Sequence, residues 1–345
     1  MLKKTIRRLG ALAMVLAMAV SVFAVNASAV AEVAPVTEQD VVIQKAITMD
    51  ENAKLPNGTF NFALEATSDK YHGSQYSAAD VNKDAVKLDD HEIKSAPNAA
   101  TNGGYLGDTA KIHIDAKKFA QPGTYKWKLT ETGSYADGAT CATQVKYLIV
   151  NITREGDTLV VYSAGLVTSD NDTSKENSFT NDYASVKLDM SKAVEGAMGD
   201  KSKFFDFTVV ITSYDSAKEY NIVNANGQNA TVGAVDKATT QEGKTTYTYA
   251  VTMKDAGALT IYGLAGNDTW TVTETADKNY STKVNGTSGN IASGTAESNG
   301  TAAFVNTANG SPVTGVIMTI APYALMVVLA GAFAVVFLTR RNRAE

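Results

Sequence analysis

Cysteine is the residue that this chain most nearly lacks. Cys141 is the only cysteine among 345 residues, so no disulfide can form within the chain. Exported β-sheet domains often rely on disulfides, and a protein of that kind must either be stable without them or carry another cross-link. A thioester at Cys141 would need a glutamine partner that nothing in the sequence identifies. This favours a solitary structural cysteine over a reactive thiol.

Histidine is also scarce, and the patterns of enzyme active sites are missing. His72, His91 and His113 have no nucleophile pattern around them, and the chain has no phosphate-binding glycine loop and no metal-ligand cluster. Residues 170–172 (Asp-Asn-Asp) lack the rest of a calcium-binding loop, which favours a solvated turn. The sequence therefore predicts no metal, no cofactor and no catalysis on external substrates.

Positive charge is scarce in the body of the chain. Residues 32–314 hold 24 of the 31 basic residues and 35 of the 36 acidic ones, which gives this segment a formal charge of −11. Such a surface argues against binding to nucleic acid or to an anionic membrane.

The two ends of the chain have the composition of export and anchoring segments. Residues 1–31 combine a basic start, an apolar run over residues 9–25 and a small-residue cleavage site at Ala27-Ser28-Ala29, which predicts a secretory signal peptide. Residues 316–338 are apolar over a length that can cross a bilayer, and three arginines follow them. This pattern predicts a C-terminal transmembrane helix with a cytoplasmic tail.

The body between these ends is predicted to be all-β, because residues typical of strands and turns dominate and stretches of helical periodicity are few. Three landmarks occur twice in the same order, which indicates two tandem domains joined by a short, stiff connection near residues 182–185. The first half also has a polar insertion around residues 68–107, where we expect a short helix or surface loops. The repeated landmarks are Phe60-Asn61-Phe62 and Phe205-Asp206-Phe207, Trp127 to Thr132 and Trp270 to Thr275, and Phe179-Thr180-Asn181 and Phe304-Val305-Asn306.

A lysine lies on the apolar face of the first predicted strand of each half. Strand side chains alternate between two faces, so every second residue shares a face. The residues that share a face with Lys45 are Val41, Ile43, Ile47 and Met49, and those that share a face with Lys192 are Val186, Leu188, Met190 and Val194. Both lysines are therefore predicted to point into a core.

A glutamate and an asparagine follow each lysine with the same core-facing parity. Glu131 and Glu274 align with the tryptophans of their segments, and Asn181 and Asn306 align with the phenylalanines of theirs. Burying such groups without partners would cost several kcal/mol. The repetition in one order predicts that lysine, glutamate and asparagine meet in each half.

A short motif stands directly before the apolar C-terminal span: Ser311, Pro312, Val313, Thr314 and Gly315. A Pro-x-Thr-Gly stretch followed by an apolar span and arginines resembles the cell-wall sorting signal of Gram-positive surface proteins. In that family a sortase cleaves between the threonine and the glycine and joins the threonine carboxyl to an amine. The family pattern usually begins with leucine, and serine in its place fits a pilus-type sortase better. A plain one-pass membrane anchor is the alternative.

The landmarks of the body resemble the isopeptide-linked pilin domains of streptococcal major pilins and related Gram-positive surface proteins. The resemblance covers most of residues 36–309 and implies two tandem Ig-like, Greek-key β-sandwich domains. It also implies that a lysine of the first strand attacks an asparagine of the last strand to form an amide, assisted by a nearby acid. Carried onto this chain, the cross-links join Lys45 to Asn181 with help from Glu131, and Lys192 to Asn306 with help from Glu274.

The chemistry of such a cross-link explains these residue types. Apolar burial favours the neutral, nucleophilic amine of lysine and the protonated form of the glutamate. A protonated acid can hydrogen-bond the carboxamide and help ammonia leave. The reaction is a single turnover within the chain, so no enzyme activity is predicted.

Polymerisation through the sorting signal needs a second, exposed amine. In the resembling family this lysine lies late in the first domain, shortly before the bonding asparagine. The matching candidate here is Lys175, in a polar stretch, while the commoner Tyr-Pro-Lys motif is absent. The other lysines of the chain cannot be ranked from sequence.

These inferences divide the chain into a signal peptide (1–31), two isopeptide-linked β-sandwich domains (32–183 and 184–309) and a sorting signal with span and tail (310–345). The predicted function is the backbone subunit of a covalent, sortase-assembled pilus. The subunit would be exported, tethered to the membrane and then anchored to the cell wall. Its predicted partners are a pilus-type sortase, copies of itself, minor pilins, host surface ligands and peptidoglycan. The alternatives are a singly anchored stalk or adhesin that binds a host ligand and, with less support, an enzyme displayed on the wall.

Overall fold

The computed structural model describes residues 35–89, 91–97, 105–169, 174–225, 227–239 and 242–310, without the side chains of residues 105–109. The predicted signal peptide, sorting motif and transmembrane helix lie outside these residues. The described part of the chain is nearly all β, as the sequence predicts. Within it, no helix is long and apolar enough to span a membrane.

The strands form two successive units, each built from two sheets. The first unit, residues 35–182, contains a sheet of order β3-β5-β1-β9 and a sheet of order β4-β2-β6-β7-β8. Its strands are β1 (Glu38–Thr48), β2 (Gly58–Ala66), β3 (Val86–Leu88), β4 (Glu92–Ser95), β5 (Tyr105–Asp115), β6 (Gly123–Tyr135), β7 (Gln144–Glu155), β8 (Thr158–Val167) and β9 (Ser178–Asp182). Three short 3-10 helices, η1 (Tyr71–Gly73), η2 (Ala78–Asp80) and η3 (Ala116–Lys118), lie between them. The polar insertion thus forms η1, η2 and the short strands β3 and β4.

The second unit, residues 186–310, repeats the plan with sheets of order β12-β15-β10-β20-β17-β18 and β13-β14-β11-β16-β19. It contains one 3-10 helix, η4 (Gly227–Asn229). Its strands are β10 (Val186–Glu195), β11 (Phe205–Ser213), β12 (Asn221–Asn224), β13 (Ala230–Thr239), β14 (Thr245–Met253), β15 (Gly257–Leu264), β16 (Thr269–Glu274), β17 (Tyr280–Val284), β18 (Thr287–Ser288), β19 (Ile291–Thr295) and β20 (Gly300–Ala308).

Each unit has its own apolar core, which side chains from both of its sheets fill. In the first unit Ile43 of β1 and Leu129 of β6 are fully buried in one cluster, and in the second unit Met190 of β10 and Val272 of β16 are buried in another. Alternate residues of β1 and β10 are buried, as the parity of the sequence predicts. The cores therefore lie between facing sheets.

The first and last strands of each unit lie side by side and run parallel. β1 pairs with β9, and β10 pairs with β20. Strands that are far apart in sequence are thus neighbours in the same sheet, where a core-facing residue of one can reach a core-facing residue of the other.

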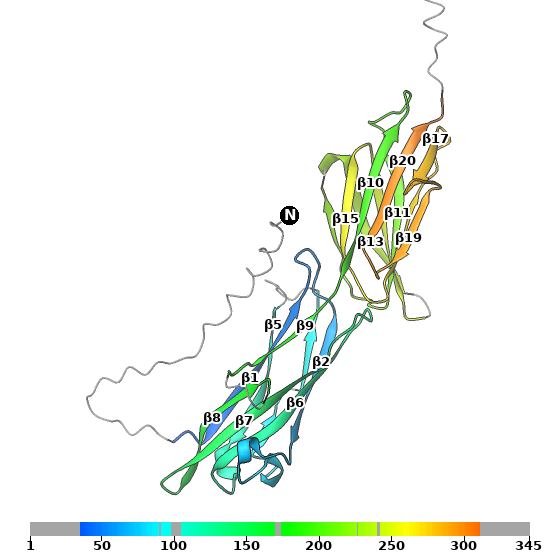
Figure 1. The fold of residues 1–345 in the computed structure, drawn as a ribbon. Helices are drawn as coiled ribbons and strands as arrows, with labels where there is room; N and C mark the ends of the chain where they lie inside the picture. The colour runs from blue at the N-terminus through cyan, green and yellow to red at the C-terminus, as the bar shows by residue number, and fades with distance from the viewer. Residues whose placement is uncertain are drawn as a thin grey trace, which may run out of the picture.

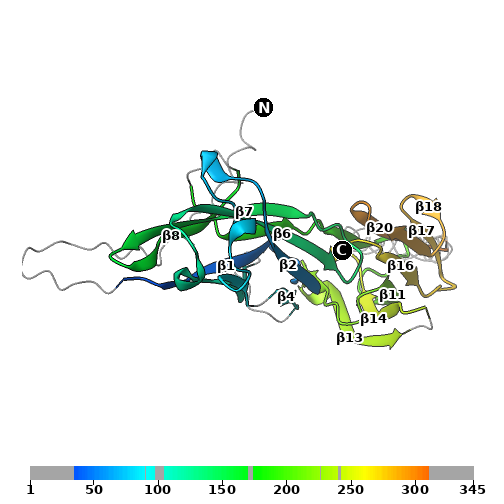
Figure 2. The ribbon, with the colours of Figure 1, turned by 90° about the horizontal axis from the view of Figure 1, so that it is seen from below.

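The two units lie end to end, with β1 beginning at one end of the molecule and β20 ending at the other (Figure 1). The view from below shows the same order along one axis (Figure 2). Only residues 183–185 separate β9 from β10. Direct contacts join the units, including a hydrogen bond of 2.6 Å from Asn57 to Asp215 and one of 2.8 Å from Asn221 to the carbonyl of Asn52. The joint is therefore packed as well as short.

Candidate cross-linking sites

The first site lies inside the first unit, where β1, β6 and β9 bring three polar side chains together. Lys45 Nζ is 2.9 Å from Glu131 Oε1 and donates a hydrogen bond of 2.6 Å to Asn181 Oδ1. The exposed fractions are 0 % for Lys45, 0 % for Glu131 and 1 % for Asn181. The three residues that the sequence singled out in this half therefore meet in the dry core.

Strand register explains this meeting. Lys45 pairs with Phe179 in the parallel β1–β9 ladder, which places Asn181 one core-facing position further along β9. Glu131 lies on the opposite sheet, paired with Phe62 of β2. The amine of Lys45 is 4.3 Å from the centre of the Phe60 ring, so aromatic side chains enclose the site and keep water out.

The second site has the same construction from β10, β16 and β20. Lys192 pairs with Phe304, two residues before Asn306, and Glu274 pairs with Phe207 of β11 on the facing sheet. The Lys192 amine is 4.3 Å from the centre of the Phe205 ring. The strand positions and the aromatic neighbour of the first site are thus repeated by the corresponding residues of the second unit.

The hydrogen bonds of the second site differ from those of the first. Lys192 Nζ donates to both carboxylate oxygens of Glu274, at 2.9 Å each, and Asn306 Nδ2 donates to Glu274 Oε1 at 2.5 Å. The glutamate here lies between the amine and the carboxamide. The buried Asn306 Oδ1 has no hydrogen-bond partner among the described residues.

Burial shifts the proton affinities of Lys45, Lys192 and Glu131 in the direction that the chemistry requires. Loss of solvation lowers the pKa of Lys45 and of Lys192, although the adjacent glutamates oppose the shift. Loss of solvation also raises the pKa of Glu131 against the opposing effect of Lys45. The neutral amine is therefore favoured at both sites, and the neutral acid at the first, relative to their ordinary state in water.

The sequence analysis missed Gln144 at the first site and did not place Cys141 there. Gln144 Nε2 donates a hydrogen bond of 2.6 Å to Asn181 Oδ1, and Asn181 Nδ2 donates to Cys141 Sγ at 2.8 Å and to the carbonyl of Ala142 at 3.0 Å. The pairing of Glu131 with Gln144 in the β6–β7 ladder is the signal that would place this glutamine at the site. Burial raises the pKa of the Cys141 thiol, and the structural role of this residue stays a prediction.

Lys175, the predicted polymerisation lysine, lies on the surface just before β9 and apart from both sites. Its amine donates a hydrogen bond of 2.8 Å to the carbonyl of Ala164, and its aliphatic stem lies over Gly165. The residues of the sorting motif, 311–315, lie outside the described residues.

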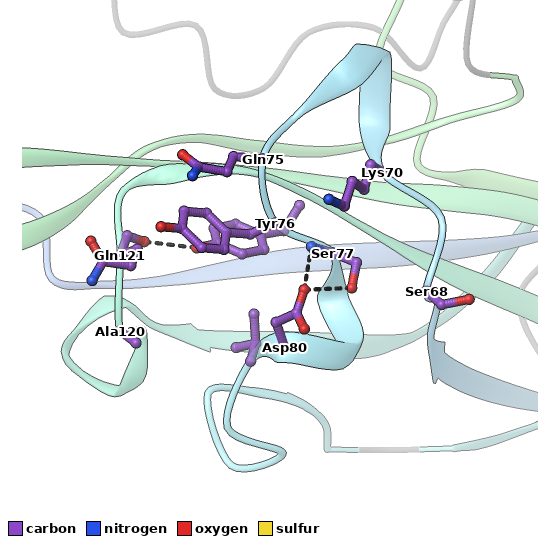
Figure 3. Close-up of a pocket in the computed structure, with 10 residues that line it drawn as sticks. Ser68, Lys70, Gln75, Tyr76, Ser77, Asp80, Ala120 and Gln121 are labelled. Carbon is purple, nitrogen blue, oxygen red and sulfur yellow. Dashed lines mark hydrogen bonds between the residues drawn. The ribbon is translucent and has the colours of Figure 1, made fainter.

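A hollow of about 560 Å³ lies beside the polar insertion of the first unit, with residues of η2 and β6 in its wall (Figure 3). Its carboxylate, Asp80, accepts hydrogen bonds from the backbone and hydroxyl of Ser77, and Tyr125 donates to the carbonyl of Gln121. In the described ranges there is no group of three or more His, Cys, Asp or Glu side chains placed to hold a metal ion. The described residues in the wall of the hollow therefore form no cluster of reactive or metal-binding side chains.

Comparison with known proteins finds pilins among the proteins that this chain is similar to. Residues 41–184 match the family described as Spy0128-like isopeptide containing domain, and residues 186–308 match a domain of unknown function, DUF7601. The first segment is thus similar to domains of the Spy0128-like type, and the resemblance to Gram-positive pilins predicted from the sequence is confirmed.

Individual relatives agree with the family. A protein named "Pilin" from Streptococcus pyogenes serotype M1 is 26% identical over 321 residues, which cover 85% of this chain and 88% of the relative. The pilus tip adhesin Cpa of Streptococcus pyogenes is 30% identical over 132 residues, 37% of this chain and 18% of the adhesin. The crystal structure of the major pilin from Streptococcus pyogenes superposes with a TM-score of 0.46 at 20% identity, covering 78% of this chain and 98% of that one.

Proposed function

We propose that this protein is a structural backbone subunit of a sortase-assembled pilus on a Gram-positive cell, stabilised by one Lys–Asn isopeptide bond in each unit. In this proposal each unit is an Ig-like, Greek-key β-sandwich, and the cross-links are Lys45–Asn181 and Lys192–Asn306. The observation that carries the proposal is the repeated, fully buried triad of amine, carboxylate and carboxamide between parallel first and last strands.

The reaction follows from the contacts of the second site. A proton passes from Lys192 to Glu274, and the neutral amine attacks Cγ of Asn306. The protonated Glu274, in contact with Asn306 Nδ2, gives its proton to the leaving amide nitrogen, and the tetrahedral intermediate collapses to an amide. Glu274 then takes one of the two protons left on the attacking nitrogen, so ammonia leaves, Glu274 ends protonated and the site has no net charge before or after the reaction. Proximity in a site closed to water turns a negligible bimolecular reaction into a fast intramolecular one.

The position of the cross-links suits a protein under tension. Pulling force enters a unit through its first strand and leaves through its last, and the proposed bonds join these strands directly. Each bond also closes most of its unit into one covalent loop, which would stabilise the folded state by about 5 kcal/mol by analogy with long-loop disulfides. The bonds replace the disulfides that a chain with one cysteine cannot form.

Assembly is proposed to use the C-terminal motif and Lys175. A pilus-type sortase would cleave between Thr314 and Gly315 and join Thr314 to Lys175 of another copy. β20 ends at the end of the second unit remote from the first, so a bond from there to the first unit of the next copy gives a linear fibre (Figure 1). The signal peptide and the transmembrane helix would bring the subunit to the outer surface, and peptidoglycan would hold the base of the fibre.

The proposed cross-links are tested by the intact mass of a recombinant body comprising residues 32–310, followed by peptide mapping. We expect a deficit of two ammonia molecules and linked peptides that contain Lys45 with Asn181 and Lys192 with Asn306. Asn181→Ala and Asn306→Ala should each lose one of the two deficits. A full, unmodified mass in the folded protein would refute both bonds.

Polymerisation separates the pilin from a singly anchored adhesin. Co-expression with the cognate sortase should give a ladder of covalent multimers, with a Thr314–Lys175 linkage in the mapped peptides. Lys175→Arg should abolish the ladder, whereas the same change at the exposed Lys128 should not. A single anchored band from the unaltered protein would favour the stalk or adhesin, and a linkage through another lysine would exclude Lys175.

A further inference from the structure

A third buried lysine lies at the junction of the two units. Lys218, between β11 and β12, is only 4 % exposed. Its amine donates hydrogen bonds of 2.6 Å to Asp137 Oδ2 and of 2.6 Å to Asp268 Oδ2. Asp137 follows β6 in the first unit, and Asp268 precedes β16 in the second. One amine thus touches two carboxyl groups from different units.

The surroundings of this cluster exclude water. Asp137 and Asp268 are 1 % and 0 % exposed. The rings of Tyr183 and Tyr220 lie 5.9 Å and 5.4 Å from the Lys218 amine, and their hydroxyls donate to Asp137 and Asp268. Lys218 therefore has what the two Lys–Asn sites have: a dry, aromatic enclosure, an acyl carbon within reach and a separate acid beside it.

The two carboxyl groups have different environments. Asp137 accepts hydrogen bonds from Lys218, from the Tyr183 hydroxyl and from the backbone of Ala139. Burial raises its pKa, but Lys218 and these donors outweigh burial and hold the pKa below the ordinary value. Asp268 also accepts three bonds, from Lys218, the Tyr220 hydroxyl and the backbone of Ala265, but all of them reach Oδ2, and Oδ1 has no hydrogen-bond partner in the described part of the chain. Burial dominates at Asp268 and raises its pKa. Asp137 is thus suited to be the base, and Asp268 to be the neutral, electrophilic acid.

We infer that Lys218 and Asp268 form a third intramolecular amide, with Asp137 as the group that removes and returns the proton. The Lys218 ammonium gives a proton to the Asp137 carboxylate, and the neutral amine attacks Cγ of the protonated Asp268. Asp137 donates this proton to the departing hydroxyl of Asp268 and then takes one of the two protons left on the attacking nitrogen, so that the amide keeps one N–H and Asp137 ends protonated. One water molecule leaves, the C–N bond replaces the C–OH bond, and the cluster has no net charge before or after the reaction.

This bond would depend on the docking of the two units. Lys218 and Asp268 both belong to the second unit, but the proton acceptor Asp137 belongs to the first. The backbone N–H of Asn267 also donates to the carbonyl of Asp137 at 3.0 Å, so the segment that carries Asp268 is held against the segment that carries the base. The amide forms only after the joint has closed, and it then fixes the loops on which the first unit rests.

The inference is independent of the proposed pilin function and of the two Lys–Asn bonds. The mass change distinguishes the bonds, because this amide releases water whereas the others release ammonia. The peptides also differ, since Lys218 and Asp268 lie outside both triads. Failure of one proposal therefore leaves the other intact.

The test is high-resolution intact mass and peptide mapping of the folded body, residues 32–310. The expected result is a loss of one water with a linked peptide containing Lys218 and Asp268. Asp137→Asn should retain the fold, seen in an unchanged near-ultraviolet circular dichroism spectrum, and should leave Lys218 unmodified. Asp215→Asn is the matched control, because Asp215 is a buried junction aspartate that bonds to Asn57, and it should keep the water loss.

Three results would overturn the inference. An unmodified Lys218 in the unaltered protein would reduce the cluster to an ion-pair network. A linkage from Lys218 to Asp137 would reverse the assignment of electrophile and base. A water loss that persists in a folded Asp137→Asn protein would exclude Asp137 as the base.

Discussion

The two lysine sites share their residue types and strand positions but differ in which group lies in the middle. In the second unit Glu274 touches both the amine of Lys192 and the amide nitrogen of Asn306. In the first unit Lys45 lies between Glu131 and the carboxamide oxygen of Asn181. The first site also has a second donor to that oxygen, Gln144, and a thiol, Cys141, at the amide nitrogen.

This difference indicates two ways to activate a carboxamide in a dry core. At the second site the acid is placed to protonate the leaving nitrogen directly. At the first site Gln144, which is not the nucleophile, donates to the carboxamide oxygen and stabilises the negative charge that develops there. Strand register determines that lysine, glutamate and asparagine meet. The residues around the asparagine determine which group activates its carboxamide.

The largest effects should come from removing the bonding asparagines. Asn181→Ala and Asn306→Ala should each lower the free energy of unfolding of their unit by about 5 kcal/mol, because the unfolded unit regains the entropy of an open chain. Denaturant unfolding measures this, with the exposed Asn61→Ala as the control that leaves both bonds in place. The stabilisation depends only weakly on loop length, so the two units should lose similar amounts. A loss of the bond without loss of stability would contradict the proposed role.

Replacing the glutamates should separate the two sites by rate. Glu274→Gln should abolish the Lys192–Asn306 bond, because the one group that contacts both reacting residues is gone. Glu131→Gln should slow the Lys45–Asn181 bond by about a hundred-fold, the lower range of general acid–base contributions, and still allow it to form, since Gln144 continues to polarise Asn181.

Mass spectra taken at intervals after refolding measure both rates. Glu176→Gln, which alters an exposed partner of Lys146, is the control and should change neither. Equal rates in Glu131→Gln and Glu274→Gln would show that the different hydrogen bonds have no kinetic consequence.

The pH dependence of bond formation should be bell-shaped at the first site. The reactive state of Lys45 and Glu131 holds one proton, located on the acid. Burial raises the pKa of Glu131 above its ordinary 4.5 and lowers that of Lys45 below its ordinary 10.5, so the range in which the pair holds one proton narrows from both sides. Below the lower limit of this pH range Lys45 remains protonated and cannot attack. Above the upper limit Glu131 loses its proton and cannot act as the acid.

Refolding Asn306→Ala protein across this range and following the ammonia loss isolates the first site. Beyond each limit the rate should fall about tenfold per pH unit. A rate that rises steadily with pH would mean that only the amine titrates and that Glu131 is not the proton carrier.

The all-β fold and the meeting of the triads follow from local patterns in the sequence. Alternation along a strand is enough to place Lys45 and Lys192 in a core, and the repeated order of lysine, glutamate and asparagine identifies the partners. The other polar contacts of the first site cannot be predicted from these patterns. Gln144 contacts Asn181 only because of the register in which β6 pairs with β7.

The junction cluster is hidden from the sequence for a related reason. Asp137 and Lys218 lie in turns, where no periodicity marks a buried face, and 81 residues separate them. Their contact depends on how two complete units dock. Such contacts require the three-dimensional structure, whereas the strand patterns do not.

The smallest effect should come from Gln144, and it tests the comparison most directly. Gln144→Ala removes one neutral hydrogen bond to Asn181 Oδ1, which is worth about 1 kcal/mol and thus about a five-fold slower first bond. The Lys192–Asn306 bond in the same molecule is the internal reference and should form at its usual rate. Cys141→Ala, which removes the thiol at the amide nitrogen and leaves the donors to the oxygen in place, should slow the first bond less. If both bonds form more slowly, Gln144→Ala acts on folding. If the rate of the first bond is unchanged, Gln144 does not activate Asn181, and the proposed difference between the two sites is wrong.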